Sequence, residues 1–222
     1  MKLTSRPRVA SLSAATFMLA ATPAFAHHPL AGAPMETFAH GVLSGIGHPL
    51  LGFDHLFFIM AVGIAALFTG RALTAPMGYI VGMLGGCTLI MAGVALPAVE
   101  LVIALSLVLV GGLLMSGRSL GLAPTMAIFA GLGLFHGWAF GESIVGQEAG
   151  AGAMVVTGYL LGLAATQWAV AVGAGMAVSR IWGAVEAQAL SARLAGGLVA
   201  GAGAFLVLEA AEGAAFAALG IG

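Results

Sequence analysis

The sequence predicts an all-α fold: an integral membrane bundle of six transmembrane helices that follows a cleaved signal peptide. Of its 222 residues, 61% are apolar and only 7% are charged, whereas soluble globular domains usually contain roughly 25% charged residues. The mean hydropathy is correspondingly high, at +1.11. A lipid bilayer is therefore the expected surrounding of most of the chain.

The first 26 residues have the pattern of a secretory signal peptide. Three basic residues precede the apolar stretch 9–21, and Ala24-Phe25-Ala26 has the A-x-A form of a cleavage site. The apolar stretch is short for a membrane span, which needs about 20 residues. We therefore expect residues 1–26 to be removed and residue 27 to be delivered outside the membrane. An uncleaved first helix is the alternative.

Six later stretches are long and apolar enough to form transmembrane helices. They cover residues 49–68, 74–96, 99–115, 122–140, 153–178 and 194–221. Residues 27–47 are expected to form a short outer segment, in which 37–46 can be an interfacial helix, and residues 48–222 the six-helix transmembrane domain. Residues 141–152 form the longest outer loop of this prediction.

The basic residues of the mature chain agree with an outward N-terminus. If residue 27 lies outside, the five loops between the spans alternate in, out, in, out, in. Arg71 falls in the first loop, Arg118 in the third, and Arg180 and Arg193 in the fifth, while the second and fourth contain no Lys or Arg. Cytoplasmic loops carry an excess of Lys and Arg. We therefore predict a multi-pass protein of the bacterial inner membrane with a periplasmic N-terminus.

Ionisable residues gather at one depth of the predicted bundle. Those in the outer half of a span, or at its outer end, are His48, Asp54, His55, Glu100, His136, Glu142, Glu209 and Glu212. Ionisable side chains are costly inside a membrane and normally face the bundle interior or a cavity. Because these residues come from four different spans, we predict that they converge on one polar site.

The segment His48-Pro-Leu-Leu-Gly-Phe-Asp-His55 sets a geometric condition on that site. Its two histidines are seven positions apart, which puts them on one face of a helix but separates them by about 10 Å. One ion can contact both only if the chain bends near Gly52. The adjacent residues Asp54 and His55 point about 100° apart on a helix and can flank a passage between neighbouring helices.

The candidate ligands favour a borderline divalent metal ion. Imidazole and carboxylate without thiolate suit nickel, cobalt or zinc, and the sequence leaves the choice among them open. The mature terminus, His27-His28, can capture a metal outside the membrane or can simply be a solvated polar end. Glu100 is either a ligand or an acid that interacts favourably with a helix N-terminus. The single cysteine, Cys87, excludes a thiolate cluster within one chain.

The motif His48-Pro-x-x-Gly-x-Asp-His55, followed by Met60-x-Val62-Gly63-x-x-Ala66, resembles the signature of the HupE/UreJ family of hydrogenase and urease accessory membrane proteins. The similarity continues through Pro97-x-x-Glu100 with Ser106 and through Phe135-His136-Gly137-Trp138-Ala139. The resemblance implies a secondary permease for nickel or cobalt with a signal peptide and six helices. It also implies that metal is handled by His48, Asp54, His55 and His136.

Two positions depart from the pattern that this resemblance implies. Many relatives have a second histidine three or four residues after the position of His136, where this chain has Phe140. Many also have a histidine in the fifth span, where this chain has Gln167. The run 141–148 resembles a subgroup found in cyanobacteria and some other bacteria. In that subgroup Glu142 would stand in as a ligand, and cobalt would be preferred to nickel.

The expected function is that of a metal permease rather than an enzyme, with Ni²⁺ or Co²⁺ as transported substrate and no permanent cofactor. A membrane-embedded zinc-dependent hydrolase with Asp54 or Glu142 as base is the alternative, and a haem protein with His55 and His136 as axial ligands is a third interpretation. The expected partners are the metal ion and the lipid bilayer, and a second copy of the chain is a further candidate. Its few basic residues exclude nucleic acid. The chain lacks a G-x-x-x-x-G-K-[ST] motif, so the membrane potential or an ion gradient would drive transport.

Overall fold

The computed structural model describes residues 35–146 and 152–220, and within these ranges the fold consists of seven helices without a strand. The prediction of an all-α fold is therefore confirmed. The predicted signal peptide and cleavage site, the two histidines at its boundary (His27 and His28) and Glu148 lie outside the described residues.

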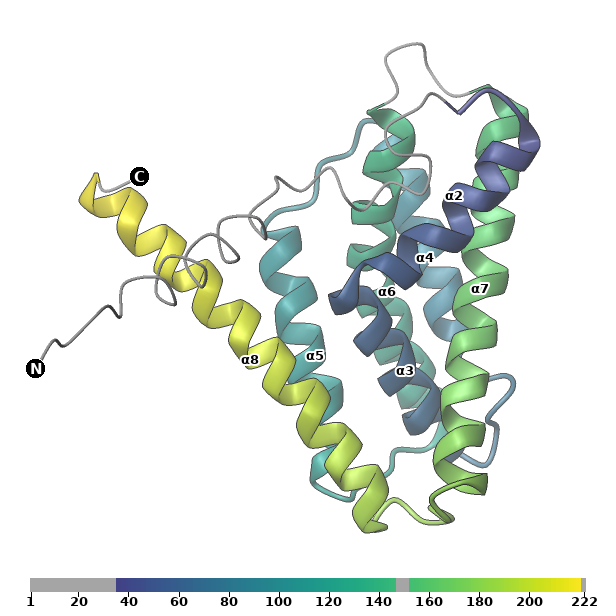
Figure 1. The fold of residues 1–222 in the computed structure, drawn as a ribbon, viewed down its shortest axis with the longest axis vertical. Coiled ribbons are helices and arrows are strands. Elements are labelled where there is room, and N and C mark those ends of the chain that lie inside the picture. Colours follow the sequence, from purple (N-terminus) through teal and green to yellow (C-terminus); the bar gives the residue numbers. More distant parts are fainter. Residues whose placement is uncertain (1–34, 147–151, 221–222) are drawn as a thin grey trace, which may run out of the picture.

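Figure 1 shows how the helices of the described residues pack against one another. They are α2 (Phe38–Leu51), α3 (Phe53–Leu67), α4 (Met77–Met91), α5 (Val99–Met115), α6 (Leu122–Val145), α7 (Ala153–Arg180) and α8 (Leu190–Leu219). The connections after α3, α5 and α7 lie at the same end of the bundle, which is therefore the end where the four arginines of the described residues are found. We call it the arginine end. Figure 1 also shows the C-terminal half of α8 leaning away from the other helices.

The lengths of the helices bear on the six predicted spans. Helices α6, α7 and α8 have 24, 28 and 30 residues and are long and apolar enough to cross a membrane. Helices α2 and α3 pass the same test together, although an 83° bend separates them. Helices α4 and α5 are apolar but shorter, with 15 and 17 residues. By length and composition, the described part of the chain thus has three spans, or four if the bent pair is one span.

Local backbone chemistry explains why α4 is shorter than the predicted span 74–96. Pro76 directly precedes the helix, and proline suits a helix start because its missing N–H has no acceptor there anyway. Beyond the other end, Gly93 has a φ of 77°, a left-handed conformation that favours glycine and stops a helix. The residues on both sides of these two signals are apolar, so a prediction from hydropathy gives a span longer than the helix.

The prediction of an outer loop over residues 141–152 was wrong at its start. Helix α6 continues to Val145, so Glu142 lies in its last turns rather than in a loop. The helix is extended because Ile144 is buried among the core side chains, where only 4% of its surface is exposed. In the sequence, the polar segment Gly141-Glu142-Ser143 gives no indication that Ile144 makes this apolar contact.

Glycines set how closely the helices that carry the candidate site can approach one another. A Cβ atom built on Gly45 of α2 would lie 2.2 Å from the carbonyl oxygen of Tyr159 in α7, and one on Gly63 of α3 would lie 1.7 Å from that of Ala171. Small residues allow this backbone contact, which stabilises membrane helix pairs through close packing. Both α2 and α3 are therefore fixed against α7, on the two sides of the bend.

The substitution Gly63→Ala is expected to destabilise the protein by about 1–3 kcal/mol, because the added methyl group forces α3 away from the α7 backbone. The measurement is the thermal unfolding midpoint in detergent. Gly173→Ala on α7 is the matched control, since a Cβ atom there meets nothing within 4 Å. Equal midpoints for the two variants would contradict the close contact between α3 and α7.

Candidate metal centre

The break between α2 and α3 brings His48 and His55 together. Gly52 adopts an extended conformation with φ −82° and ψ 103°, and its N–H donates to the carbonyl oxygen of His48. The ring centroids of the two histidines are 6.2 Å apart, compared with about 10 Å for residues two turns apart on a continuous helix. The bend near Gly52 on which a shared site depends is therefore present.

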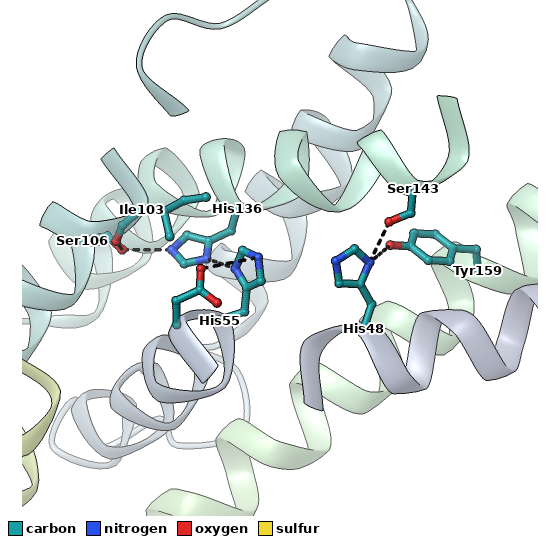
Figure 2. A network of polar contacts seen from close by, with 8 residues as sticks. His48, His55, Ile103, Ser106, His136, Ser143 and Tyr159 are labelled. Carbon is teal, nitrogen blue, oxygen red and sulfur yellow. Dashed lines mark hydrogen bonds and ion pairs between the residues drawn. The ribbon is translucent and has the colours of Figure 1, made fainter. Parts of the chain in front are cut away.

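A chain of hydrogen bonds fixes the proton positions on His55 and His136 (Figure 2). The hydroxyl of Ser106 donates to the carbonyl oxygen of Ile103 at 2.6 Å, so it accepts the bond from Nε2 of His136 at 2.9 Å. Nδ1 of the neutral His136 ring is then an acceptor, and Nδ1 of His55, 2.9 Å away, carries the proton between them. This proton assignment follows from the network of partners. In its neutral form, His55 therefore has its lone pair on Nε2.

A second chain fixes the tautomer of His48 in the same way. The hydroxyl of Tyr159 donates to the carbonyl oxygen of Phe140 at 2.8 Å, so it can only accept from Nδ1 of His48, which lies 3.0 Å away. The hydroxyl of Ser143 lies 2.8 Å from the same nitrogen. Nδ1 of His48 therefore carries the proton, and in the neutral ring Nε2 carries the lone pair.

The two hydrogen-bond chains have the same chemical consequence. A histidine binds a metal ion through an unprotonated ring nitrogen, while its other nitrogen donates a hydrogen bond that orients the ring. Both His48 and His55 have their Nδ1 atoms held by protein partners. The two rings lie side by side across the break, with their planes inclined by 72° (Figure 2). In their neutral forms, both rings have a basic Nε2 atom, the kind of atom that binds a metal ion.

Phe140 forms the apolar wall of this site. Its ring centroid lies 4.3 Å from that of His55 and 5.1 Å from that of His48, and its side chain is fully buried. The sequence already marked this residue as a departure from the pattern expected from the resemblance. The structure adds that it contacts both imidazoles, so a ligating side chain at this position would reach the same site.

Carboxylates line a cavity beside the histidines. Asp54 has its Oδ2 atom 3.9 Å from Nε2 of His55 and also faces a cavity of about 260 Å³ between α3, α5 and α8. Glu100 and Glu209 line the same cavity. Asp54 therefore joins the carboxylate-lined cavity to the histidine pair.

The other predicted ligands are distributed unevenly. His136 is fully buried, and both of its ring nitrogens are engaged by His55 and Ser106, so in this arrangement it orients His55. Glu142 and Glu212 are exposed on α6 and α8 and do not line the cavity of Asp54. Within residues 35–146 and 152–220, the structure has no group of three or more His, Cys, Asp or Glu side chains that could hold a metal ion. The predicted convergence is thus realised for the histidines and, in part, for the carboxylates.

Sequence reasoning missed the roles of Tyr159 and Ser143. Tyr159 lies 111 positions from the histidine that it orients, in an apolar span without other ionisable groups. The general requirement that a buried tyrosine hydroxyl find a partner indicates that Tyr159 has a polar neighbour but not which one. Ser143 lies within the predicted outer loop 141–152, for which the sequence predicts no fixed neighbours.

These observations define the class of the protein: an all-helical membrane protein in which the bent helix pair α2–α3 carries two oriented histidines, the partly buried His48 and the buried His55. The chain belongs to the HupE/UreJ family, whose model, described as HupE / UreJ protein, matches residues 15–206. The family is associated with accessory functions for hydrogenase and urease. Protein HupE of Rhizobium leguminosarum bv. viciae is 36% identical over 197 residues, which cover 87% of this chain and 95% of that relative. No solved structure matches the chain significantly.

The substitution Tyr159→Phe is expected to weaken metal binding by about 10–100-fold, the usual effect of removing a partner that orients a ligand. The aromatic ring remains, but Nδ1 of His48 loses the acceptor oxygen 3.0 Å away. Binding is measured by cobalt titration of the purified protein. Thr157→Val, which removes an exposed hydroxyl of the same helix, is the control. Unchanged affinity in Tyr159→Phe would show that the hydroxyl does not orient a ligand.

Proposed function

We propose that the protein is a secondary permease that carries a divalent transition-metal ion, nickel or cobalt, inward across the bacterial inner membrane. The observation that carries the proposal is the pair of His48 and His55, partly buried and buried, whose Nδ1 atoms are held by protein partners so that the neutral rings have basic Nε2 atoms. Such a pair is suited to a borderline divalent ion. The ion is the transported substrate, which would supply the assembly of a metalloenzyme or cofactor.

The proposed membrane arrangement has six spans after a cleaved signal peptide and a periplasmic mature N-terminus. In it α2 and α3 together form a broken first span, and the shorter α4 and α5 form the second and third. Broken helices are found in transporters where backbone groups and side chains line a binding site at membrane depth. The arginine end is then cytoplasmic, in agreement with the excess of basic residues on that side of membranes.

The ion would enter from the outer side through the carboxylate-lined cavity. Glu100, Glu209 and Asp54 attract a dication and replace part of its water. Replacement is necessary because an ion without ligands in an apolar medium faces a cost on the order of tens of kcal/mol. From Asp54 the path leads to Nε2 of His55, 3.9 Å away.

The membrane potential is sufficient as a driving force in this proposal. Two positive charges that move inward gain about 4.6 kcal/mol per 100 mV of potential. A rocking motion of one part of the bundle against another would open the histidine site to the arginine end, as in other secondary transporters. The break at Gly52 is the pivot of this proposal, because the backbone leaves the helical conformation there, with φ −82° and ψ 103°.

The test is uptake of radioactive nickel and cobalt by cells that express the intact protein, compared with cells that carry an empty vector. Saturable uptake of one ion is expected, and Asp54→Asn at a matched membrane level is expected to lower it by more than about tenfold, because the neutral amide neither attracts nor ligates the ion well. Glu186→Gln, in the connection before α8, is the control for loss of an acidic residue elsewhere. Uptake no higher than in empty-vector cells, for both ions, would overturn the proposal.

A further inference from the structure

Outside the histidine pair, several buried polar atoms have no hydrogen-bond partner within the described part of the protein. Within the described residues, the hydroxyl of Tyr79 and both polar atoms of the Gln167 side chain have no hydrogen-bond partner, although both residues are 0% exposed. Buried polar groups are almost always hydrogen-bonded, and each exception needs an explanation. Gln167 is the stronger case, because its amide is unsatisfied at both ends.

We propose that Tyr79 and Gln167 form a second, weaker station for the transported ion, on the arginine-end side of the histidine pair. This inference rests on the permease function proposed above and extends its route. Neutral oxygen atoms, Oη of Tyr79 and Oε1 of Gln167, receive the partly hydrated ion when it leaves His55. During passage, these polar atoms of Tyr79 and Gln167 would then contact the ion and hydrogen-bond to its water molecules.

Tyr79 lies beside His136, the ring that contacts His55. Its ring centroid lies 6.0 Å from that of His136 and 5.5 Å from that of Phe58. Phe58 stacks on His136 with a centroid distance of 4.1 Å and follows His55 by one turn of α3. Tyr79 is also in the first turn of α4, which starts at the arginine end. Tyr79 is therefore connected to His55 through His136 and lies toward the arginine end.

Gln167 approaches the same level from α7. Tyr159, which orients His48, is two turns before it, and Ala171, whose carbonyl oxygen meets Gly63 of α3, is one turn after it. Since α3 and α7 both run toward the arginine end, Gln167 lies between the level of His48 and that of Gly63. The neighbouring Trp168 donates from Nε1 to the carbonyl oxygen of Leu73 at 3.0 Å, which ties this part of α7 to the segment that leads into α4.

The chemistry of the two residues suits release rather than capture. Nickel and cobalt bind imidazole nitrogen more firmly than neutral hydroxyl or amide oxygen. A conducting path needs sites that favour entry yet hold the ion weakly enough to let it leave. A step from imidazole to neutral oxygen meets this requirement, because it lowers the affinity in the direction of transport without leaving the ion unsolvated.

The test is uptake by the double variant Tyr79→Phe/Gln167→Leu, which keeps the side-chain sizes and removes the unsatisfied polar atoms. Maximal uptake is expected to fall at least about tenfold, in the range that loss of an ion-supporting partner produces, while the half-saturating concentration stays nearly unchanged. Ser44→Ala is the matched control. Ser44 is equally buried and unpartnered within the described residues but lies one turn before His48, on the outer side.

A binding measurement keeps the test independent of folding and of uptake itself. In cobalt titrations, the unsubstituted protein is expected to bind one cobalt ion tightly at the histidine pair and a second one more weakly. The purified double variant is expected to keep the tight binding and to lose the weak binding. If the unsubstituted protein transports and the double variant transports equally, the second station is refuted and the permease stands. If the unsubstituted protein transports neither ion, the permease and the station fail together.

Discussion

Cells that express His55→Phe should show nickel and cobalt uptake no higher than empty-vector cells, even though the variant reaches the membrane at the normal level. The substitution removes the Nε2 ligand nearest to Asp54, and its effect should exceed the about 10–100-fold loss that removal of an orienting partner causes. It also leaves Nδ1 of the buried His136 without the proton donor 2.9 Å away. Uptake assays at matched membrane levels, with cobalt binding to purified protein, measure both effects.

His40→Phe is the control for this experiment, because it replaces a histidine of the same bent helix pair outside the site. The His40 ring accepts from the backbone N–H of Glu36 near the beginning of α2. Normal uptake is expected for His40→Phe. If His55→Phe transported as well as His40→Phe, the histidine pair would have no role in transport.

Phe140→His is expected to produce the largest gain in affinity. The Phe140 ring is fully buried against both His48 and His55, so an imidazole in its place would supply a third nitrogen ligand. Binding should tighten by at least about tenfold, with a preference shifted from cobalt toward nickel in accordance with their order of affinity for nitrogen ligands. Maximal uptake should fall, because an ion that is held more firmly leaves more slowly.

The affinity change is measured by titration with cobalt and by its displacement with nickel, and the ligand set is followed by the cobalt absorption spectrum. Phe140→Leu is the control, since it removes the aromatic ring without adding a ligand. An affinity and a spectrum that are the same in Phe140→His and Phe140→Leu would show that residue 140 does not reach the metal.

The helix boundaries illustrate how far sequence reasoning extended. The predicted span 99–115 coincides with α5, because Pro97 and a run of polar and glycine residues bracket a uniformly apolar stretch. The prediction put the boundary between 37–46 and 49–68 too early in the chain. Helix α2 continues through Pro49 to Leu51, and the break falls at Gly52 instead.

The candidate site was predictable in its level but only partly in its contacts. Counting residues along alternating spans put His48, His55 and His136 at one depth, and the structure brings them together. The same count also put Glu142 at this depth. Its side chain, however, is exposed on α6 and does not line the cavity of Asp54. Depth follows from the number of residues along a span, whereas the direction of a side chain depends on how that span is rotated.

The sequence by itself determined that this chain is an α-helical membrane protein with polar groups concentrated toward one side of the bilayer. These properties are sums of single-residue transfer energies and helical periods, which need no knowledge of neighbours. Only the tertiary structure decided the angle of the break at Gly52, the choice of Tyr159 as partner of His48, and the packing of Phe140 against both histidines. These features depend on which helix faces pack together. That choice is set by backbone contacts at small residues such as Gly45 and Gly63, whose partners lie about a hundred residues further along the chain.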